Sequence, residues 1–251
     1  MSNTVVIIPS RLEAKRLPNK PLKLIGKKEM ILHVYNLALE SKVGRVLVAT
    51  PDQDICELIK KNGGDSFLSI NKHETGTDRV FEAFKNFYSS KPKIIINLQG
   101  DMPKFDSSAI VELNKYLEKG LCDIATLASS IKNEKEIKNQ NIVKVITKNS
   151  IEKSDFSEAL DFKRDLPTTK ERFIYHHIGI YGFTSEALIR YVNLKRSKLE
   201  LDRNLEQMRA LENKMKIHVG YTTSNPLSVD TEGDLEEVKK LMEKKQCLKR
   251  K

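Results

Sequence analysis

The sequence predicts an α/β protein with a mainly parallel sheet that helices cover on both faces. Short runs rich in β-branched residues at Thr4–Pro9, Arg45–Thr50 and 93–98 are typical of buried strands. Segments with apolar residues at helical spacing separate these runs, and such β-α alternation favours a parallel sheet. The 251 residues, 39% of them hydrophobic, suffice for one large domain or for a core domain with an excursion.

The remaining elements follow from apolar spacing in chain order. Helices are predicted over 31–39, over 55–59 with Asp52 or Asp54 near the start, over 80–87 and after Asp106. Further strands are predicted at 123–129, 142–147, 173–183 and 216–221, and further helices at 186–192, 199–212 and 231–245. Segment 149–172 is charged and weakly periodic, which predicts an excursion or loop. We therefore expect a single domain over 1–251, with an elaboration at about 149–212.

The net charge of +10 raises the possibility of a nucleic-acid-binding protein. The basic residues are, however, spread through every helix with acidic residues between them, and the chain has no Trp. This pattern favours a lysine-rich, solvated surface over a nucleic-acid site. A basic balance would still help to attract an anionic substrate.

Several protein classes are disfavoured by what the sequence lacks. No apolar run approaches eighteen residues, and the N-terminus has no signal-peptide pattern, so we expect a cytoplasmic protein without a membrane partner. The cysteines Cys56, Cys122 and Cys247 are scattered and odd in number, which is typical of reduced thiols.

The stretch IPSRLEAKRLPNKPL at 8–22 follows the first strand and carries Arg11, Lys15, Arg16 and Lys20 between prolines. It matches neither a dinucleotide-binding turn nor a P-loop. Arginine and lysine side chains on a stiffened loop offer another way to hold a polyphosphate. A surface loop that happens to be basic is the alternative, and composition alone does not decide between them.

Two aspartates lie where carboxylates could hold a cation. Asp101 follows Gly100 at the end of a predicted strand and would be a hard oxygen ligand for Mg²⁺, although an Asp in a turn is common. Thr231 and Asp234 form a capping-box-like pair at the start of the last helix. That pair explains Thr231 but not Asp230, which precedes it.

Stretch 8–22 resembles the IPAR…RLPGKPL loop of the sugar nucleotidyltransferases, and among them of the cytidylyltransferases that activate eight- and nine-carbon sugar acids. Ser10 replaces Ala, and Asn19 replaces Gly, which Asn can do because it tolerates left-handed backbone. Further blocks resemble the family in the same order from Val5 to about Met242, and they are most similar to the enzymes that act on 3-deoxy-manno-octulosonate (Kdo). These blocks are NLQGDMP at 97–103 (family NVQGDEP), HETGTDR at 73–79 (H-x-SGTER), HHIGIYGF at 176–183, LEQMRAL at 205–211 and SVDTEGDL at 228–235 (VDTPEDL).

The resemblance implies a Rossmann-like, glycosyltransferase-A-like fold and a role for each matching residue. Asp101 and Asp230 would hold Mg²⁺, and Lys20 would stabilise charge on the α-phosphate. Met102 stands where the family usually has an acidic residue, and Lys198 and Arg203 stand where it usually has Pro and Glu. The implied CTP-binding residues are Ser10, Arg11, Arg16, Lys20, Gly76, Thr77 and Arg79. The implied sugar-acid-binding residues are Gln99, Arg164, His177, Tyr181, Glu206 and Gln207.

The implied reaction joins CTP to Kdo, giving CMP-Kdo and pyrophosphate for lipopolysaccharide synthesis. The resemblance also implies a homodimer that uses the elaboration, with no nucleic-acid partner. Two alternatives remain: a cytidylyltransferase for amino-Kdo, sialic or pseudaminic acid, and a non-catalytic nucleotide- or RNA-binding protein.

Overall fold

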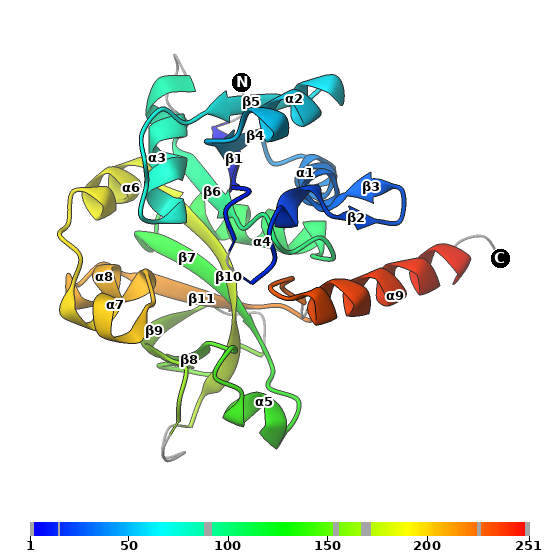
Figure 1. Cartoon of the computed structure of the whole chain (residues 1–251). Helices are drawn as coiled ribbons and strands as arrows, with labels where there is room; N and C mark the ends of the chain where they lie inside the picture. The colour runs from blue at the N-terminus through cyan, green and yellow to red at the C-terminus, as the bar shows by residue number, and fades with distance from the viewer. Residues whose placement is uncertain are drawn as a thin grey trace. The chain divides into compact units, whose positions relative to one another are not determined.

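The computed structural model describes residues 3–14, 16–87, 92–152, 156–166, 172–224 and 227–248 (Figure 1). Lys15 and the end of the basic tail lie outside the described residues. The chain forms two compact units, which are described separately. Unit 1 contains residues 1–92, 97–111 and 226–251, and unit 2 contains residues 93–96 and 112–225. The single domain expected over 1–251 stays a prediction.

Unit 1 is built on three parallel strands in the order β5-β4-β1. Helix α1 packs on β4, α2 packs on β4 and β5, and α3 packs on β1 and β4. Helix α3 lies on the side of the strands opposite to α1 and α2 (Figure 1), as right-handed crossovers require. The elements of this unit are β1 (Thr4–Pro9), η1 (Lys20–Leu22), β2 (Leu24–Ile25), β3 (Lys28–Glu29), α1 (Met30–Glu40), β4 (Arg45–Thr50), α2 (Gln53–Lys61), β5 (Asp65–Leu68), α3 (Gly76–Phe87) and α9 (Glu232–Leu248).

The predicted strands of unit 1 are confirmed. The structure places β1 and β4 at the predicted residues, and every residue of β1 is buried. Continuous apolar runs form strands here because helices cover both faces of the sheet. Strand β6 (Ile94–Leu98) begins one residue later than predicted, and its residues are divided between the two units, as are those of α4 (Ser107–Leu117).

Unit 2 contains strands in the order β10-β7-β11-β9-β8, and β10 also pairs with β8. Among the strand pairs that the described residues of this unit form, the β11–β7 pair is parallel and the β10–β7, β10–β8, β11–β9 and β8–β9 pairs are antiparallel. The α/β class is confirmed, and unit 2 adds mixed pairing to the parallel strands of unit 1. Its elements are β7 (Ile124–Ser129), α5 (Glu134–Lys138), β8 (Lys144–Thr147), β9 (Ser157–Lys163), β10 (Ile174–Thr184), α6 (Ser185–Val192), α7 (Lys198–Arg203), α8 (Gln207–Glu212) and β11 (Ile217–Tyr221).

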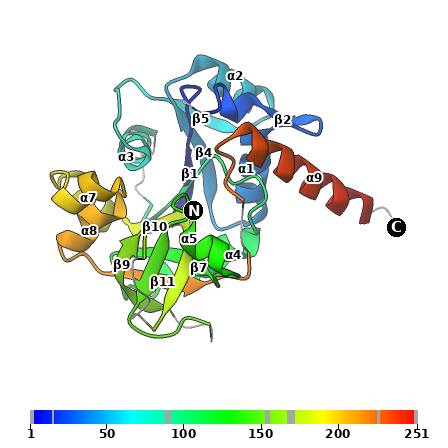
Figure 2. The same cartoon turned by 60° about the horizontal axis from the view of Figure 1, so that its bottom comes forward.

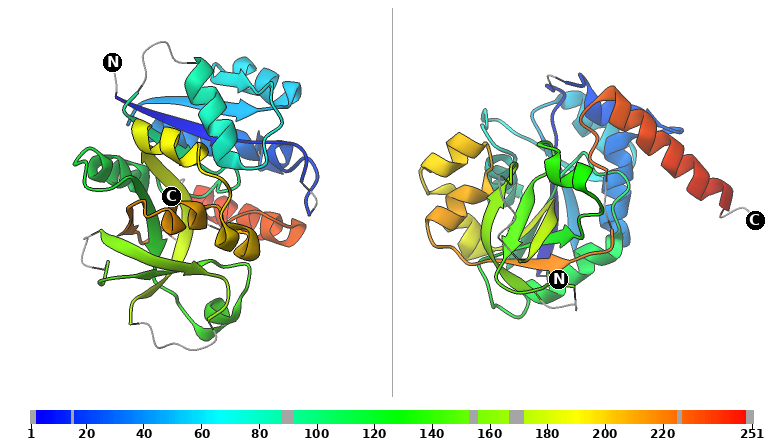
Figure 3. Two further views of the ribbon diagram at one scale, coloured as in Figure 1. Left: turned by 90° about the vertical axis from the view of Figure 1, so that its left-hand side faces the viewer. Right: turned by 90° about the horizontal axis from the view of Figure 1, so that it is seen from below.

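Two predictions for unit 2 were wrong. Segment 149–172, predicted as an excursion or loop, contains β9, whose alternating buried and exposed residues fit a strand that is half-buried. The single helix predicted over 199–212 is two helices, α7 and α8, which lie side by side (Figure 3). The break occurs at Asn204, whose φ of 52° is left-handed and ends α7.

Helix α9 belongs to unit 1, although the other helices and strands of that unit come from the first half of the sequence. The predicted capping pair is present, because the Thr231 backbone N–H donates to Asp234 Oδ2 at 2.8 Å and the Asp234 N–H donates to Thr231 Oγ1 at 3.3 Å. Figure 2 shows α9 beside β2 and α1. Apolar residues there form what we call the basal cluster: Leu17, Ile25, Met30, Val229, Leu235 and Val238, all buried.

No helix in the described part of the chain is long and apolar enough to cross a membrane. Cys56 and Cys122 are buried free thiols.

Candidate active site

The basic loop after β1 is fixed by backbone hydrogen bonds. The Leu12 N–H donates to Asp52 Oδ2 at 2.7 Å, and the Leu12 carbonyl accepts from the Asn19 N–H at 3.2 Å. Asn19 has a φ of 56°, which confirms the prediction that it takes the left-handed backbone of the family's Gly. Asp52 precedes α2, as predicted, but its carboxylate anchors this loop and makes no side-chain cap. The loop is therefore closed on itself and tied to the end of β4.

Lys20 lies between the two predicted metal ligands. Its Nζ is 3.0 Å from Asp101 Oδ2 and 3.2 Å from Asp230 Oδ1. Arg16 Nη2 is 3.0 Å from Asp230 Oδ2. The Lys20 side chain is 17% exposed, whereas Arg16 is 57% exposed. Three segments separated by about 80 and 130 residues of sequence thus meet in one cluster of charges within unit 1.

The electrostatic balance keeps Lys20 charged. Burial alone would lower the pKa of its ammonium group, but the negative charges of Asp101 and Asp230 outweigh burial, and the pKa is raised above 10.5. Lys20 is therefore a permanent cation at neutral pH, placed where two carboxylates face it.

The backbone and the basal cluster position these three side chains. The Val229 N–H donates to the Asp101 carbonyl at 2.9 Å, so the two aspartate segments are joined directly. Val229 and Leu17 both belong to the basal cluster. In the sequence, Val229 directly precedes Asp230, and Leu17 directly follows Arg16. The Asp230 N–H donates to Asp234 Oδ2 at 3.1 Å, which links Asp230 to the cap of α9.

Gly100 lies where two backbone segments approach closely. A Cβ at this position would lie 3.1 Å from the Pro9 carbonyl oxygen and 3.5 Å from Ile31 Cδ1. The two backbone segments therefore leave little room for a side chain at this position. A larger residue would require the Pro9 carbonyl to move by a few tenths of an ångström, next to Asp101.

The donor set at Asp101 and Asp230 fits Mg²⁺. Both carboxylates point at one cation, Lys20 Nζ, so their oxygens already face a common position. Mg²⁺ prefers hard oxygen ligands and few protein groups, since substrate phosphates and water complete its shell. The described residues contain no group of three or more His, Cys, Asp or Glu suited to a metal ion, so no richer site competes.

The other predicted CTP-binding residues gather at the strand ends and at the start of α3 in unit 1. Ser10 directly follows β1, and its N–H donates to the Ala49 carbonyl at 2.9 Å. Gly76 and Thr77 begin α3, and Thr77 Oγ1 accepts from Asn97 Nδ2 at 3.3 Å. Gln99, predicted to face the sugar acid, donates through Nε2 to Asn97 Oδ1 at 2.9 Å. Arg11 is exposed, whereas Arg79 is buried.

In unit 2, the structure brings three predicted sugar-acid residues together. The ring centroids of His177 and Tyr181 are 5.4 Å apart, and His177 Nε2 lies 3.0 Å from Thr126 Oγ1. Burial lowers the pKa of His177 to about 3, so it is neutral at pH 7. Burial, with the charge of Glu206 next, raises the pKa of Tyr181, which remains a hydrogen-bond donor.

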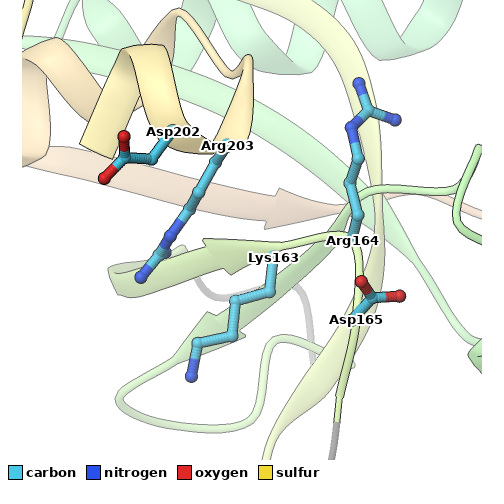
Figure 4. A pocket seen from close by; sticks show the side chains of 5 residues that line it. All are labelled: Lys163, Arg164, Asp165, Asp202 and Arg203. Carbon is cyan, nitrogen blue, oxygen red and sulfur yellow. The ribbon is translucent and has the colours of Figure 1, made fainter. Parts of the chain in front are cut away.

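The remaining sugar-acid candidates have different surroundings. Gln207 is buried at the start of α8. Arg164 Nη1 donates to the carbonyl of Gln140 at 3.0 Å and to that of Asn141 at 3.4 Å. Figure 4 shows Arg164 on the wall of a hollow of about 370 Å³, with its guanidinium directed away from that of Arg203. Lys163, Asp165, Asp202 and Arg203 also line the hollow.

The two adjacent histidines lie on opposite faces of β10, as alternation along a strand predicts. His177 is buried against Phe162, whose ring centroid is 5.1 Å away. His176 is half-buried, and burial followed by the nearby charges of Lys144 and Lys132 lowers its pKa, against the opposing charge of Glu136. The pair therefore does not share one metal ion.

Sequence reasoning missed three polar residues of unit 1 that belong to this region: Asp52 as a loop anchor, Ser69 and Glu82. Ser69 follows β5, and its N–H donates to the Thr50 carbonyl at 2.8 Å. Glu82 lies on α3, one turn after Arg79. No local signal separates such residues from an ordinary turn or a solvated helix face, because their roles depend on distant backbone groups.

A basic, anchored loop that faces one carboxylate after a strand and another before a helix is typical of nucleotidyltransferases with an α/β fold. A family model described as cytidylyltransferase matches residues 5–217, and the chain belongs to this family. The 3-deoxy-manno-octulosonate cytidylyltransferase of Bartonella tribocorum is 38% identical over 243 residues, which cover 95% of this chain and 98% of the relative. The enzyme of the same name from Brucella ovis is 39% identical over 234 residues, 93% of each chain.

A solved structure is similar over nearly the whole chain. It is that of CMP:2-keto-3-deoxy-manno-octonic acid synthetase complexed with CTP, and it is 32% identical with a TM-score of 0.87. The match covers 97% of this chain and 100% of the other.

Proposed function

We propose that this protein joins CTP to Kdo, releasing pyrophosphate and forming CMP-Kdo. The observation that carries the proposal is the position of Lys20 between Asp101 and Asp230. The chain also matches relatives that are named for this activity, over nearly their full length. The anomeric hydroxyl oxygen attacks the α-phosphorus and loses its proton. The bond from the α-phosphorus to the bridging oxygen breaks, and pyrophosphate leaves with that electron pair.

The residues of unit 1 would act on the triphosphate. Arg11 and Arg16 are exposed cations on an anchored loop, and they would hold phosphate oxygens. Lys20 stays charged and would neutralise charge that develops at the α-phosphate in the transition state. Mg²⁺, which Asp101 and Asp230 would hold, supplies further charge neutralisation on phosphate oxygens when it is bound.

The residues of unit 2 would bind the sugar acid. Tyr181 is a hydroxyl donor, and neutral His177, whose Nε2 already pairs with Thr126 Oγ1, offers its Nδ1. Glu206 and Gln207 would accept and donate hydrogen bonds to sugar hydroxyls, and Arg164 would contact the carboxylate. Gln99, which belongs to unit 1, would also face the sugar acid. Binding of the sugar acid would position the attacking hydroxyl, and this positioning raises the rate without a covalent enzyme intermediate. We further propose a homodimer in the cytoplasm, without a nucleic-acid or membrane partner, as the family resemblance implies.

The test is pyrophosphate release from CTP and Mg²⁺ in parallel reactions with Kdo, amino-Kdo and sialic acid. We expect release with Kdo. Release with only another of these acids would keep the chemistry and refute the substrate, and no release in any reaction would refute the function. The matched variant is Asp101→Asn, for which we expect loss of turnover with an unchanged circular dichroism spectrum. Pyrophosphate release near the wild-type rate by this variant would contradict the metal assignment.

A further inference from the structure

A buried ion pair joins α7 to α8, which lie side by side in unit 2 (Figure 3). Arg209 donates to both carboxylate oxygens of Glu200, through Nε to Oε2 at 2.8 Å and through Nη2 to Oε1 at 2.6 Å. The Glu200 side chain is 1% exposed and that of Arg209 is 3% exposed. Burial would raise the pKa of Glu200, but hydrogen bonds from Arg209 and Arg196 outweigh burial, and the pKa is lowered below its ordinary 4.5. Glu200 is therefore a buried anion at neutral pH.

Stability alone does not account for this pair. Taking two charges out of water is costly, and apolar residues of similar volume often replace a buried ion pair without loss of stability. What the pair does supply is geometry, because two parallel hydrogen bonds hold the planar guanidinium in one orientation. In that orientation Arg209 Cζ lies 4.6 Å from the ring centroid of Tyr191, so the pair fixes one face of this ring.

Tyr191 links the ion pair to the backbone at the start of α8. It lies on α6 and is 2% exposed, and its hydroxyl donates to the Glu206 carbonyl at 2.9 Å. The same carbonyl accepts from the Arg209 N–H at 3.1 Å, and the Leu205 N–H donates to the Glu200 carbonyl at 3.2 Å. The backbone that carries the Glu206 side chain is therefore tied to α6, to α7 and to α8 itself.

Tyr191 also belongs to the row of rings that contains two proposed sugar-acid residues. The ring centroids of Tyr191 and Phe183 are 5.8 Å apart, those of Phe183 and Tyr181 are 6.4 Å apart, and those of Tyr181 and His177 are 5.4 Å apart. Burial, and next the charges of Glu206 and Tyr191, raise the pKa of Tyr181, so the Glu206 carboxylate lies within electrostatic range of that hydroxyl. One side chain therefore connects this row of rings with the backbone of Glu206.

We propose that Tyr191, held by the Glu200–Arg209 pair, is a positioning residue that fixes Glu206 for its contact with the sugar acid. The inference rests on the proposed function. A hydrogen bond from a sugar hydroxyl to the Glu206 carboxylate depends steeply on distance and angle, so a small shift of the backbone at Glu206 weakens it. The loss falls on the sugar acid and not on CTP, because these residues all belong to unit 2 whereas the basic loop belongs to unit 1.

The experiment measures pyrophosphate release with Kdo varied at saturating CTP, and with CTP varied at saturating Kdo. We expect Tyr191→Phe, which keeps the ring and loses the hydroxyl, to raise the KM for Kdo by roughly three- to tenfold, the range for one hydrogen bond. The KM for CTP should stay at the wild-type value. Tyr175→Phe is the matched control, since Tyr175 is 4% exposed and its hydroxyl bonds Ser150 Oγ and the Ile151 N–H, both at 3.3 Å. This variant also loses a buried hydroxyl in unit 2, but it should keep both KM values.

The ion pair is tested by the same two constants. Arg209→Lys keeps the charge but loses the two parallel hydrogen bonds to Glu200, and we expect it to raise the KM for Kdo as Tyr191→Phe does. The double variant Glu200→Met with Arg209→Met is measured beside it, because exchange of both partners for apolar residues often spares stability. We expect the double variant to melt near the wild-type temperature and still to show the raised KM for Kdo. A merely structural role would move the melting temperature and leave this KM unchanged.

The outcomes separate the inference from the proposed function. An active wild-type protein whose folded Tyr191→Phe variant keeps the KM for Kdo overturns the positioning role and leaves the proposed function intact. An equal rise of this KM in Tyr175→Phe overturns it as well. A folded double variant with the wild-type KM for Kdo overturns the part assigned to the ion pair. A wild-type protein that releases no pyrophosphate with Kdo overturns both proposals.

Discussion

Lys20 forms ion pairs with two aspartates, Asp101 and Asp230, and its replacement should lower the turnover number. We expect Lys20→Met to lower kcat by about 10²–10³-fold, with a smaller rise in the KM for CTP, because the lost charge acts mainly in the transition state. Steady-state kinetics of pyrophosphate release measures both constants. Lys23→Met, at a 40% exposed lysine 4.0 Å from Glu232, is the control and should remain near wild type. A change confined to KM would contradict the transition-state role.

His177 should make stability depend on pH. Its folded pKa of about 3 lies below its ordinary 6.5, so between these values the unfolded chain binds the additional proton. The free energy of unfolding should therefore fall by about 1.4 kcal/mol for each pH unit below 6.5, down to about pH 3. The contribution is complete above pH 6.5.

Urea denaturation at pH 7.0 and pH 5.0 measures this loss. We expect His177→Asn to be less stable than wild type at pH 7.0 but to lose less stability between the two values. Equal losses in wild type and variant would show that His177 is not the group that titrates.

Among the structural elements, α9 should couple stability to catalysis. Leu235 is 1% exposed in the basal cluster, which also contains Leu17 of the basic loop and Val229 beside Asp230. We expect Leu235→Ala to lower the free energy of unfolding by about 2–5 kcal/mol, the usual cost of such a cavity. Because the cluster positions Asp230 and Lys20, kcat should fall as well, even where the variant is fully folded.

Chemical denaturation and kinetics at 20 °C measure both effects. Leu39→Ala on α1 is the control, since Leu39 is 46% exposed and its loss should change stability by no more than about 0.5 kcal/mol. Normal kcat in a folded Leu235→Ala variant would show that the cluster only stabilises unit 1.

The elements also show what the sequence can predict. Strands β1 and β4 follow from continuous apolar runs, and the cap of α9 follows from Thr231 and Asp234, because these signals are local. Strand β9 was not predicted because its buried residues include the small Ser157 and Ala159 whereas Leu160 is 52% exposed, so the apolar alternation is weak. Asn204 split a helix because either an α-helical or a left-handed conformation is open to Asn. The sequence did not predict the roles of Asp52, Ser69 and Glu82. Each of these residues contacts a backbone or side-chain group that only the fold brings near.

At the scale of the whole molecule, the net charge of +10 should assist capture of an anionic nucleotide. We expect kcat/KM for CTP to fall severalfold between about 50 and 500 mM KCl while kcat changes little, because salt screens exposed charges more than the half-buried Lys20. Initial rates at low CTP concentration measure this. A protein that instead bound RNA tightly, with a steep salt dependence and without pyrophosphate release, would favour the nucleic-acid alternative.

The hydrogen bond from the Val229 N–H to the Asp101 carbonyl joins two segments that are synthesised far apart in time. Lys20 and Asp101 are synthesised well before Asp230 and α9, since Asp230 follows Asp101 by about 130 residues. The segment between them, residues 112–225, supplies nearly all of unit 2 and can fold while the chain is still growing. Nascent protein therefore carries the basic loop long before it carries a complete carboxylate pair. A chain stalled short of Val229 would lack Asp230, and so we expect it to lack the carboxylate pair that faces Lys20.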